Sequence, residues 1–268
     1  MFPLPEVKKA FPHFNILREL GSGGQGSVFH ITTGSGEEAA LKIYDLRNNI
    51  EKRLEHEEDA LSALHSDVIA SVLDSGTAVV DSVDCIFALY QFIPGENLDQ
   101  IKSHRLLDEA QIIRLLVDIS EAIDQLWSVR VVHRDIKPEN IMLCSANGRM
   151  VLIDLALAKH LNASTLTTIG MAVGTVGYMS PEQYLGQKYL SLKSDLYSLG
   201  IVTYECSTGI HPFGGIQNQV LTTVPPPISV HRRGLDPRIE VIVSEMLMFH
   251  PQRRPQSGAA IRTRLGIR

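Results

Sequence analysis

The sequence predicts an α+β protein in which a small, antiparallel β-rich lobe with one helix precedes a larger, mainly helical lobe. Short β-type runs separated by glycine clusters occupy about the first ninety residues. From Leu107 onward, apolar residues recur at the helical period instead. The change of pattern places the joint at about residues 91–95, so we expect an N-lobe over about 1–91 and a C-lobe over about 95–268.

Three β-type runs in the N-lobe cover residues 14–20, 27–32 and 38–44. The clusters GSGGQG and GSG separate them, and short glycine turns between such runs are typical of an antiparallel meander. We therefore expect these runs to form one sheet.

The first glycine cluster holds Gly21, Gly23 and Gly26, a spacing that dinucleotide-binding folds also use. In those folds a helix follows the glycines, whereas here the sequence SVFHI continues as a strand. We interpret the glycines as a hairpin tip whose backbone N–H groups can approach phosphates.

The one helix of the N-lobe is predicted in the segment NNIEKRLEHEEDALSALH, where Glu57 falls on the apolar stripe. That stripe comprises Ile50, Leu54, Leu61 and Leu64. An unpaired buried carboxylate is destabilising by several kcal/mol, so a cation should lie near Glu57. Lys42, close to the end of the third β-type run, is the candidate, although a lysine taken alone more commonly reaches the surface there.

The first long helix of the C-lobe is predicted to start at a capping box formed by Asp108 and Gln111. Its apolar stripe repeats at the helical period and comprises Ile112, Leu115, Leu116, Ile119, Ile123 and Leu126.

Composition narrows the class of partner and the compartment. A net charge of −5 gives no overall attraction to nucleic acid or to an anionic membrane. Three scattered cysteines without a CxxC pair argue against a disulfide framework or a zinc site, so we expect a reducing, cytoplasmic location. No apolar run of about 18 residues is present, so we expect a soluble chain without a membrane segment.

Residues 133–140 read HRDIKPEN and follow an apolar, β-like run. They bring together a carboxylate, Asp135, an ammonium, Lys137, and a carboxamide, Asn140. Phosphoryl transfer needs such groups: a base for the hydroxyl proton, a cation for the moving phosphoryl group and an oxygen ligand for magnesium. The octapeptide resembles the catalytic loop of eukaryotic-type (Hanks-type) serine/threonine protein kinases, and the later form MSPEQ is common in bacterial members.

This resemblance implies a bilobal protein-kinase-like fold with a single kinase domain over residues 1–268. In AALK, Lys42 would hold the α and β phosphates of ATP, with Glu57 as its partner. Asp135 would accept the substrate proton, Lys137 would meet the γ-phosphate, and Asn140 would ligate magnesium. His133 is expected to pack in the core.

The adenine site follows from the same resemblance. Val28 and Ala40 would form an apolar roof and Met142 the floor, although each alone would be an ordinary core residue. The backbone of Gln91 to Ile93 would meet the adenine edge, and Tyr90 at the gatekeeper position would narrow the back pocket.

The segment VLIDLALAK departs from the family pattern. Asp154 would be the metal-bridging carboxylate, but Ala156 replaces the usual glycine, and alanine avoids backbone angles that glycine reaches. We interpret this as a restriction on switching. It also motivates the main alternative, a pseudokinase that serves as a nucleotide- or partner-binding scaffold.

The polar stretch that follows resembles an activation loop, in which Thr165, Thr167 and Thr168 are the expected phosphosites. By the same resemblance, Thr175 should help to hold the catalytic aspartate and lysine. Further supports are expected from a Glu182–Arg254 ion pair and from Asp195, which would brace the catalytic loop.

We therefore predict a protein kinase that transfers the γ-phosphate of ATP to serine or threonine hydroxyls, with Mg²⁺, or alternatively Mn²⁺, as the metal. The expected partners are protein substrates and not nucleic acid, and self-association would allow autophosphorylation in trans. A small-molecule kinase of the aminoglycoside or choline type is disfavoured because such enzymes lack a segment like GTVGYMSPEQ.

Overall fold

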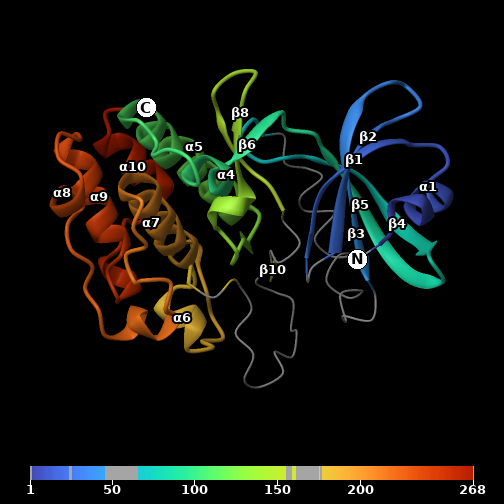
Figure 1. The fold of residues 1–268 in the computed structure, drawn as a ribbon. Coiled ribbons are helices and arrows are strands. Elements are labelled where there is room, and N and C mark those ends of the chain that lie inside the picture. The colour runs from blue at the N-terminus through green and yellow to red at the C-terminus, as the bar shows by residue number, and fades with distance from the viewer. Residues whose placement is uncertain are drawn as a thin grey trace. The chain divides into compact units, whose positions relative to one another are not determined.

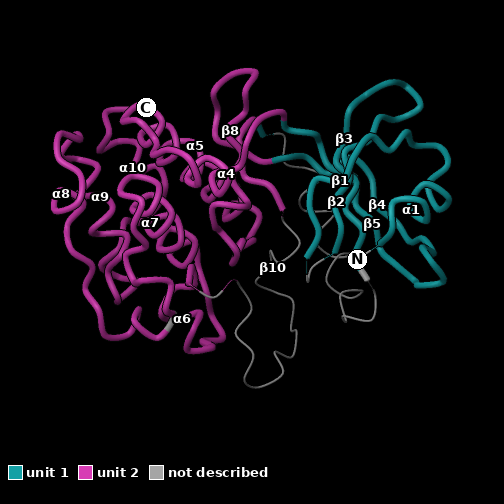
Figure 2. The backbone as a smooth tube through the Cα atoms, viewed as in Figure 1, with its two compact units in different colours: residues 1–66, 70–93 teal, residues 67–69, 94–268 magenta. Residues whose placement is uncertain are grey.

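The computed structural model describes residues 2–23, 26–45, 66–154, 159–160, 175 and 177–267. The chain divides into two compact units, residues 1–66 with 70–93 and residues 67–69 with 94–268 (Figure 2). Each unit has a hydrophobic core of its own.

The first unit is built on a five-stranded antiparallel sheet with the strand order β1-β2-β3-β5-β4 (Figure 1). Its described elements are α1 (Leu4–Ala10), β1 (Asn15–Gly23), β2 (Gly26–Thr32), β3 (Glu38–Asp45), β4 (Val72–Val80) and β5 (Val83–Gln91). The three predicted runs match β1, β2 and β3, and β1 continues through the glycines to Gly23.

Alternation along β2 and β3 gives the sheet two chemically different faces. Phe29, Leu41 and Ile43 are fully buried in the core cluster on one face. The neighbouring positions Val28 and Lys42, which are direct partners across the two strands, therefore lie on the opposite face. Val28 and Lys42, two of the residues expected to contact nucleotide, thus share one side of the sheet.

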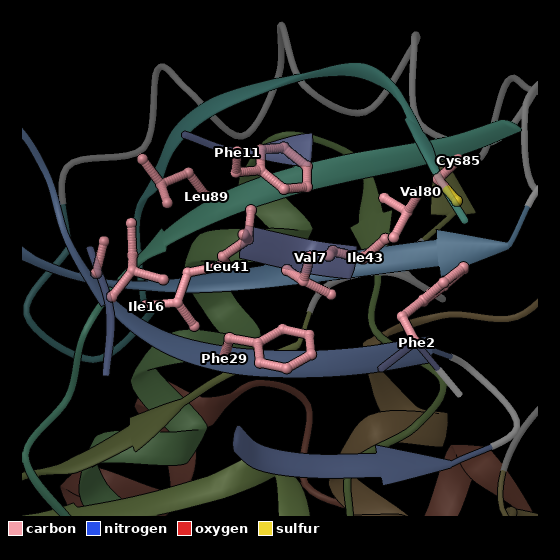
Figure 3. Packing of buried hydrophobic residues seen from close by; sticks show 12 residues of the cluster. Phe2, Val7, Phe11, Ile16, Phe29, Leu41, Ile43, Val80, Cys85 and Leu89 are labelled. Atoms are coloured by element: carbon pink, nitrogen blue, oxygen red, sulfur yellow. The ribbon is translucent and has the colours of Figure 1, made fainter. Parts of the chain in front are cut away.

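The helix α1 was not predicted from the sequence, and it packs against the core face of the sheet. Val7 and Phe11 lie beside Leu41 and Ile43 in this cluster (Figure 3). A proline in its first turn is compatible with helix, because the first N–H groups need no intrahelical partner. The helix predicted around Glu57 lies outside the described residues.

The second unit is mainly helical. Its first elements are β6 (Gly95–Asn97), α4 (Leu98–Lys102), α5 (Glu109–Ser128), β7 (Val131–Val132), η2 (Pro138–Asn140), β8 (Ile141–Cys144), β9 (Met150–Leu152) and β10 (Lys159–His160). The remaining ones are α6 (Pro181–Tyr184), α7 (Leu192–Thr208), η3 (Gln217–Leu221), α8 (Ile228–His231), α9 (Pro237–Met246), η4 (Pro251–Arg253) and α10 (Gly258–Arg264). An antiparallel sheet followed by a helical unit confirms the predicted α+β fold class.

Two helices form the centre of the second unit (Figure 1). Asp108 and Gln111 make both hydrogen bonds of the predicted capping box at the start of α5, and the predicted apolar stripe is buried. The helix α7 packs against α5 and α9 and is buried on almost every side. No helix in the described part of the chain has the length and apolar character needed to cross a bilayer.

Candidate active site

The backbone of the loop after β7 is fixed by a buried carboxylate in the first turn of α7. Asp195 accepts the N–H of His133 at 2.8 Å and the N–H of Arg134 at 2.9 Å, one with each oxygen. Burial raises the pKa of Asp195, and these backbone donors oppose the rise. Arg134 has a φ of 69°, an uncommon conformation that the two hydrogen bonds around it stabilise. Asp195 thus makes the contacts expected of a residue that braces the catalytic loop, and His133 is fully buried as expected.

The carboxylate of Asp135 lies at the centre of the next group of contacts and is 3% exposed. Its Oδ1 accepts from Thr175 N at 2.9 Å and from Thr175 Oγ1 at 2.7 Å. Its Oδ2 lies 3.0 Å from Lys137 Nζ and 3.2 Å from Asn140 Nδ2. Because Lys137 also donates to Thr175 Oγ1 at 2.6 Å, the four side chains form a closed network.

Asn140 and Asp154 have the chemistry that a hard divalent metal prefers, oxygen ligands. The Asn140 amide nitrogen is committed to Asp135, with a second bond of 2.8 Å to its carbonyl, which leaves Oδ1 as the group that can ligate. Ile153 N donates to the Asn140 carbonyl at 2.9 Å, so the backbone before Asp154 is tied to the same loop. Asp154 itself has a φ of 63°, a conformation that non-glycine residues adopt mainly at sites that impose it.

Within the described residues, no three side chains of His, Cys, Asp or Glu gather as a metal site. A metal held by Asn140 and Asp154 would need further oxygen ligands, which the phosphates of a nucleotide supply.

The predicted glycine hairpin is present in the first unit. Gly21 pairs with Val28 and Gly23 with Gly26 across β1 and β2. Gly26 has a φ of 132°, and a Cβ there would overlap the carbonyl oxygen of Ile43. Only glycine satisfies both conditions, so the base of the hairpin depends on Gly26.

Lys42 is 6% exposed on the sheet face opposite the core. Its Nζ lies over the ring of Tyr44 at 5.0 Å from the centroid. The Tyr44 hydroxyl is 3.3 Å from the hydroxyl of Tyr90, which pairs with Ala40 across β3 and β5. Two tyrosines, Tyr44 and Tyr90, therefore lie near Lys42. The sequence predicted only Tyr90 at this site.

The remaining adenine-site residues are divided between the units. The Gln91 N–H donates to the Ser71 carbonyl at 2.9 Å, and Ile93 is buried at the end of the first unit. Met142 belongs to the second unit, where it pairs with Val151 in the small sheet.

Several predicted residues lie outside the described part of the chain. They are Glu57, Ala156, Thr165, Thr167 and Thr168. The Lys42–Glu57 pair and the three phosphosites therefore stay predictions.

The expected ion pair between Glu182 and Arg254 is present and buried. The two Nη atoms of Arg254 bind the two carboxylate oxygens at 2.7 and 2.9 Å, and Ser194 donates to Glu182 at 2.7 Å. Burial alone would raise the pKa of Glu182, but Arg254 and Ser194 outweigh it and hold that pKa below its ordinary value.

Three supporting hydrogen bonds had no individual signal in the sequence. Gln183 Nε2 donates to the Arg134 carbonyl at 2.7 Å, although the sequence pointed only to its neighbour in SPEQ. Tyr178 donates to Glu205 at 2.7 Å, while its carbonyl accepts from Ser198 at 2.7 Å. They link segments far apart in the chain, so spacing could not have found them.

Known proteins with sequences similar to this chain are named serine/threonine-protein kinases, the class that the sequence predicts. A probable serine/threonine-protein kinase of Streptomyces coelicolor is 30% identical over 91% of the chain. The serine/threonine-protein kinase pkn3 of Myxococcus xanthus is 31% identical over 92% of it. The chain spans 38% and 48% of these two relatives. The relatives support the predicted serine/threonine kinase class and give no support to the pseudokinase alternative.

The fold has a matching solved structure, the kinase domain of Mycobacterium tuberculosis PknI. The TM-score is 0.73 at 20% identity, with 94% of this chain and 96% of that chain covered, which confirms the bilobal kinase-like fold. The profile of the family described as protein kinase domain, whose members use ATP and a divalent metal ion, matches residues 14–264. By this match over nearly its whole length, the chain belongs to the protein kinase domain family.

Proposed function

We propose that this protein transfers the γ-phosphate of ATP to serine or threonine hydroxyls of protein substrates, with Mg²⁺ as the metal ion. The observation that carries the proposal is the closed network of Asp135, Lys137, Thr175 and Asn140. It fixes a carboxylate beside an ammonium, the pair that acceptor alignment and charge neutralisation require.

Asp135 is the group that orients the acceptor hydroxyl and takes its proton. The transition state of phosphoryl transfer is loose in most analyses, so alignment of the oxygen matters more than early deprotonation. Thr175 and Asn140 keep the carboxylate in one orientation, and Lys137 supplies positive charge for the phosphoryl oxygens.

Asn140 and Asp154 are the proposed metal ligands, and a bound Mg²⁺ would supply positive charge that neutralises the phosphate oxygens. In the other lobe, Lys42 is the proposed ligand of the α and β phosphates, with Gly21, Gly23 and Gly26 providing backbone that can approach them. Val28, Ala40, Gln91, Ile93 and Met142 are the proposed adenine contacts.

The compartment and partners are proposed on separate grounds. Cys85, Cys144 and Cys206 are buried free thiols, which supports a reducing location such as the cytoplasm. The net charge of −5 favours protein substrates over nucleic acid. Autophosphorylation of the activation loop would require transient self-association.

The test is incubation of the purified protein with ATP and either Mg²⁺ or Mn²⁺, followed by intact mass measurement and phosphosite mapping. An Asp135→Asn variant is the control, and it should react about 10²- to 10⁴-fold more slowly. Phosphate on serine or threonine in the wild type alone is the expected result. Equal labelling of both proteins, or no labelling despite ATP-dependent thermal stabilisation, would overturn the proposal.

A further inference from the structure

His211 contacts backbone on both sides of its ring, just after the end of α7. Its Nε2 lies 3.1 Å from the carbonyl oxygen of Gly177. Its Nδ1 accepts the N–H groups of Phe213 at 3.1 Å and Gly215 at 2.9 Å. A nitrogen that accepts two N–H groups cannot carry a proton, so Nε2 carries it and donates to Gly177. The contacts therefore select the neutral imidazole in one tautomer.

The Gly177 carbonyl, which accepts from His211, is connected to Asp135 through hydrogen bonds of Thr175. Tyr178 N donates to the Thr175 carbonyl at 3.2 Å, so Gly177 lies inside a tight turn. Thr175 in turn binds the Asp135 carboxylate through its N–H and its hydroxyl. Gly177 has a φ of 106°, a backbone conformation that glycine adopts readily and other residues rarely do.

We propose that neutral His211 is a positioning residue for protein substrates, because it fixes the turn at Gly177 and Tyr178 next to Asp135. This inference rests on the proposed kinase function, in which Asp135 aligns the acceptor hydroxyl, so the segment that carries that hydroxyl has to pass close to the turn that contacts Asp135 through Thr175. His211 would then act on the binding of the protein substrate and leave ATP binding unchanged.

Burial is the main reason that the imidazole stays neutral. It lowers the pKa of His211 and outweighs the charge of Glu205 and the hydrogen bond to Gly177, which both raise the pKa, while the charge of Lys102 lowers it further. Glu205 is itself engaged by Lys102 Nζ at 3.2 Å and by the Tyr178 hydroxyl at 2.7 Å, and Lys102 also lies 3.3 Å from Asp99. The Tyr178 ring packs edge-on against the imidazole. Protonation of Nδ1 would set a new N–H against two existing N–H donors.

The sign of the pH effect follows from this lowered pKa. Above the ordinary value of 6.5, both the folded and the unfolded chain keep His211 neutral, and its contribution to the turn is complete. As the pH falls, the unfolded chain gains a proton near 6.5, whereas His211 in the folded protein stays neutral until the pH approaches its lowered pKa, and only there does protonation remove that contribution. We therefore expect substrate binding to weaken on the acid side.

Two substitutions of His211 test the contacts of Nδ1 and of Nε2 separately. In His211→Asn the amide oxygen can replace Nδ1 as acceptor for Phe213 and Gly215, but the side chain is too short to reach Gly177. In His211→Gln the amide nitrogen can reach Gly177, while the acceptor at Nδ1 is lost. Neither side chain titrates in this pH range. The matched control is His104→Asn, an exposed histidine in the same unit.

The first readout is steady-state phosphorylation of dephosphorylated casein. We expect His211→Asn to raise the KM for casein roughly five-fold, the effect of one lost hydrogen bond, with the KM for ATP unchanged. His211→Gln should recover part of this loss, and the fall in kcat/KM from about pH 7 to about pH 5 should be smaller in both variants. An unchanged casein KM in His211→Asn, or a rise equal to that of His104→Asn, would overturn the proposal.

The second readout does not need activity. Hydrogen–deuterium exchange in peptides covering residues 175–184 should be faster in His211→Asn than in His104→Asn, with equal melting temperatures. If the wild type phosphorylates nothing, the proposed function fails, and this exchange measurement still decides the role of His211. Unchanged exchange in this segment would reject that role.

Discussion

Arg254→Lys is expected to destabilise the second unit strongly although it keeps the charge. The guanidinium donates from Nε to the Met248 carbonyl at 2.8 Å, and from Nη1 to Glu182 at 2.7 Å and to the Lys193 carbonyl at 2.9 Å. Nη2 donates to Glu182 and to the Phe249 carbonyl, each at 2.9 Å. All the N–H groups of Arg254 are thus used, with its side chain 0% exposed.

A lysine ammonium has three donors, so at least two of these five acceptors would lose their partner in a buried place. Each buried group left without a hydrogen bond destabilises by about 1–3 kcal/mol. The guanidinium also lies 4.6 Å from the centroid of the Tyr197 ring, a stacking contact that lysine makes less well. We expect a loss of about 3–5 kcal/mol in the free energy of unfolding.

Urea unfolding followed by tryptophan fluorescence measures this loss of stability in the second unit. Trp127 is the single tryptophan, and it lies in α5 of the same unit as Arg254. Arg253→Lys, the same change at the exposed neighbouring position, is the control and should lie within about 0.5 kcal/mol of the wild type. If the two variants unfold at the same urea concentration with equal slopes, the reasoning from the hydrogen-bond geometry is refuted.

Two further predictions concern the glycine hairpin and acid stability. Gly26→Ala should lower the melting temperature measured without ATP, because of its positive φ and the overlap with Ile43. Gly21→Ala has open space and should leave that melting temperature nearly unchanged, so equal shifts in the two variants would contradict this. Because the pKa of Glu182 is lowered in the folded protein, the unfolded chain binds a proton first as the pH falls, so the free energy of unfolding should decrease below the ordinary value of 4.5. Glu182→Gln should make the free energy of unfolding less dependent on pH in this range, as measured by Trp127 fluorescence. The same pH dependence in the variant and the wild type would contradict this prediction.

Local patterns were sufficient where neighbours in sequence make the structure. The glycine hairpin and the capping box at Asp108 involve residues only a few positions apart, so spacing alone indicated them. The run HRDIKPEN likewise places Asp135 and Asn140 in one loop, and the structure joins them by hydrogen bonds.

Contacts between distant segments were beyond the sequence unless a resemblance indicated them. The pairing of Glu182 with Arg254 came from the family, whereas the contacts that His211 and Gln183 make were not predicted, because their partners depend on how loops return to the site. The helix α1 escaped notice because seven residues are too few for a helical period to be seen. Residues 67–69 belong to the second unit, which the sequence did not indicate. The Val68 carbonyl accepts the N–H of Leu152 at 2.9 Å, a hydrogen bond between segments that are far apart in the chain.

The burial of α7 on almost every side has a consequence for how the protein opens. Amides in such a helix exchange with solvent only when the whole unit unfolds, whereas the turn at Gly177 lies outside that helix and can open in a smaller, sub-global event. Asp195 attaches the backbone beside Asp135 to α7 and not to that turn. The backbone that carries Asp135 would therefore stay in place when the turn opens, and only the contacts of Thr175 with the Asp135 carboxylate would be affected.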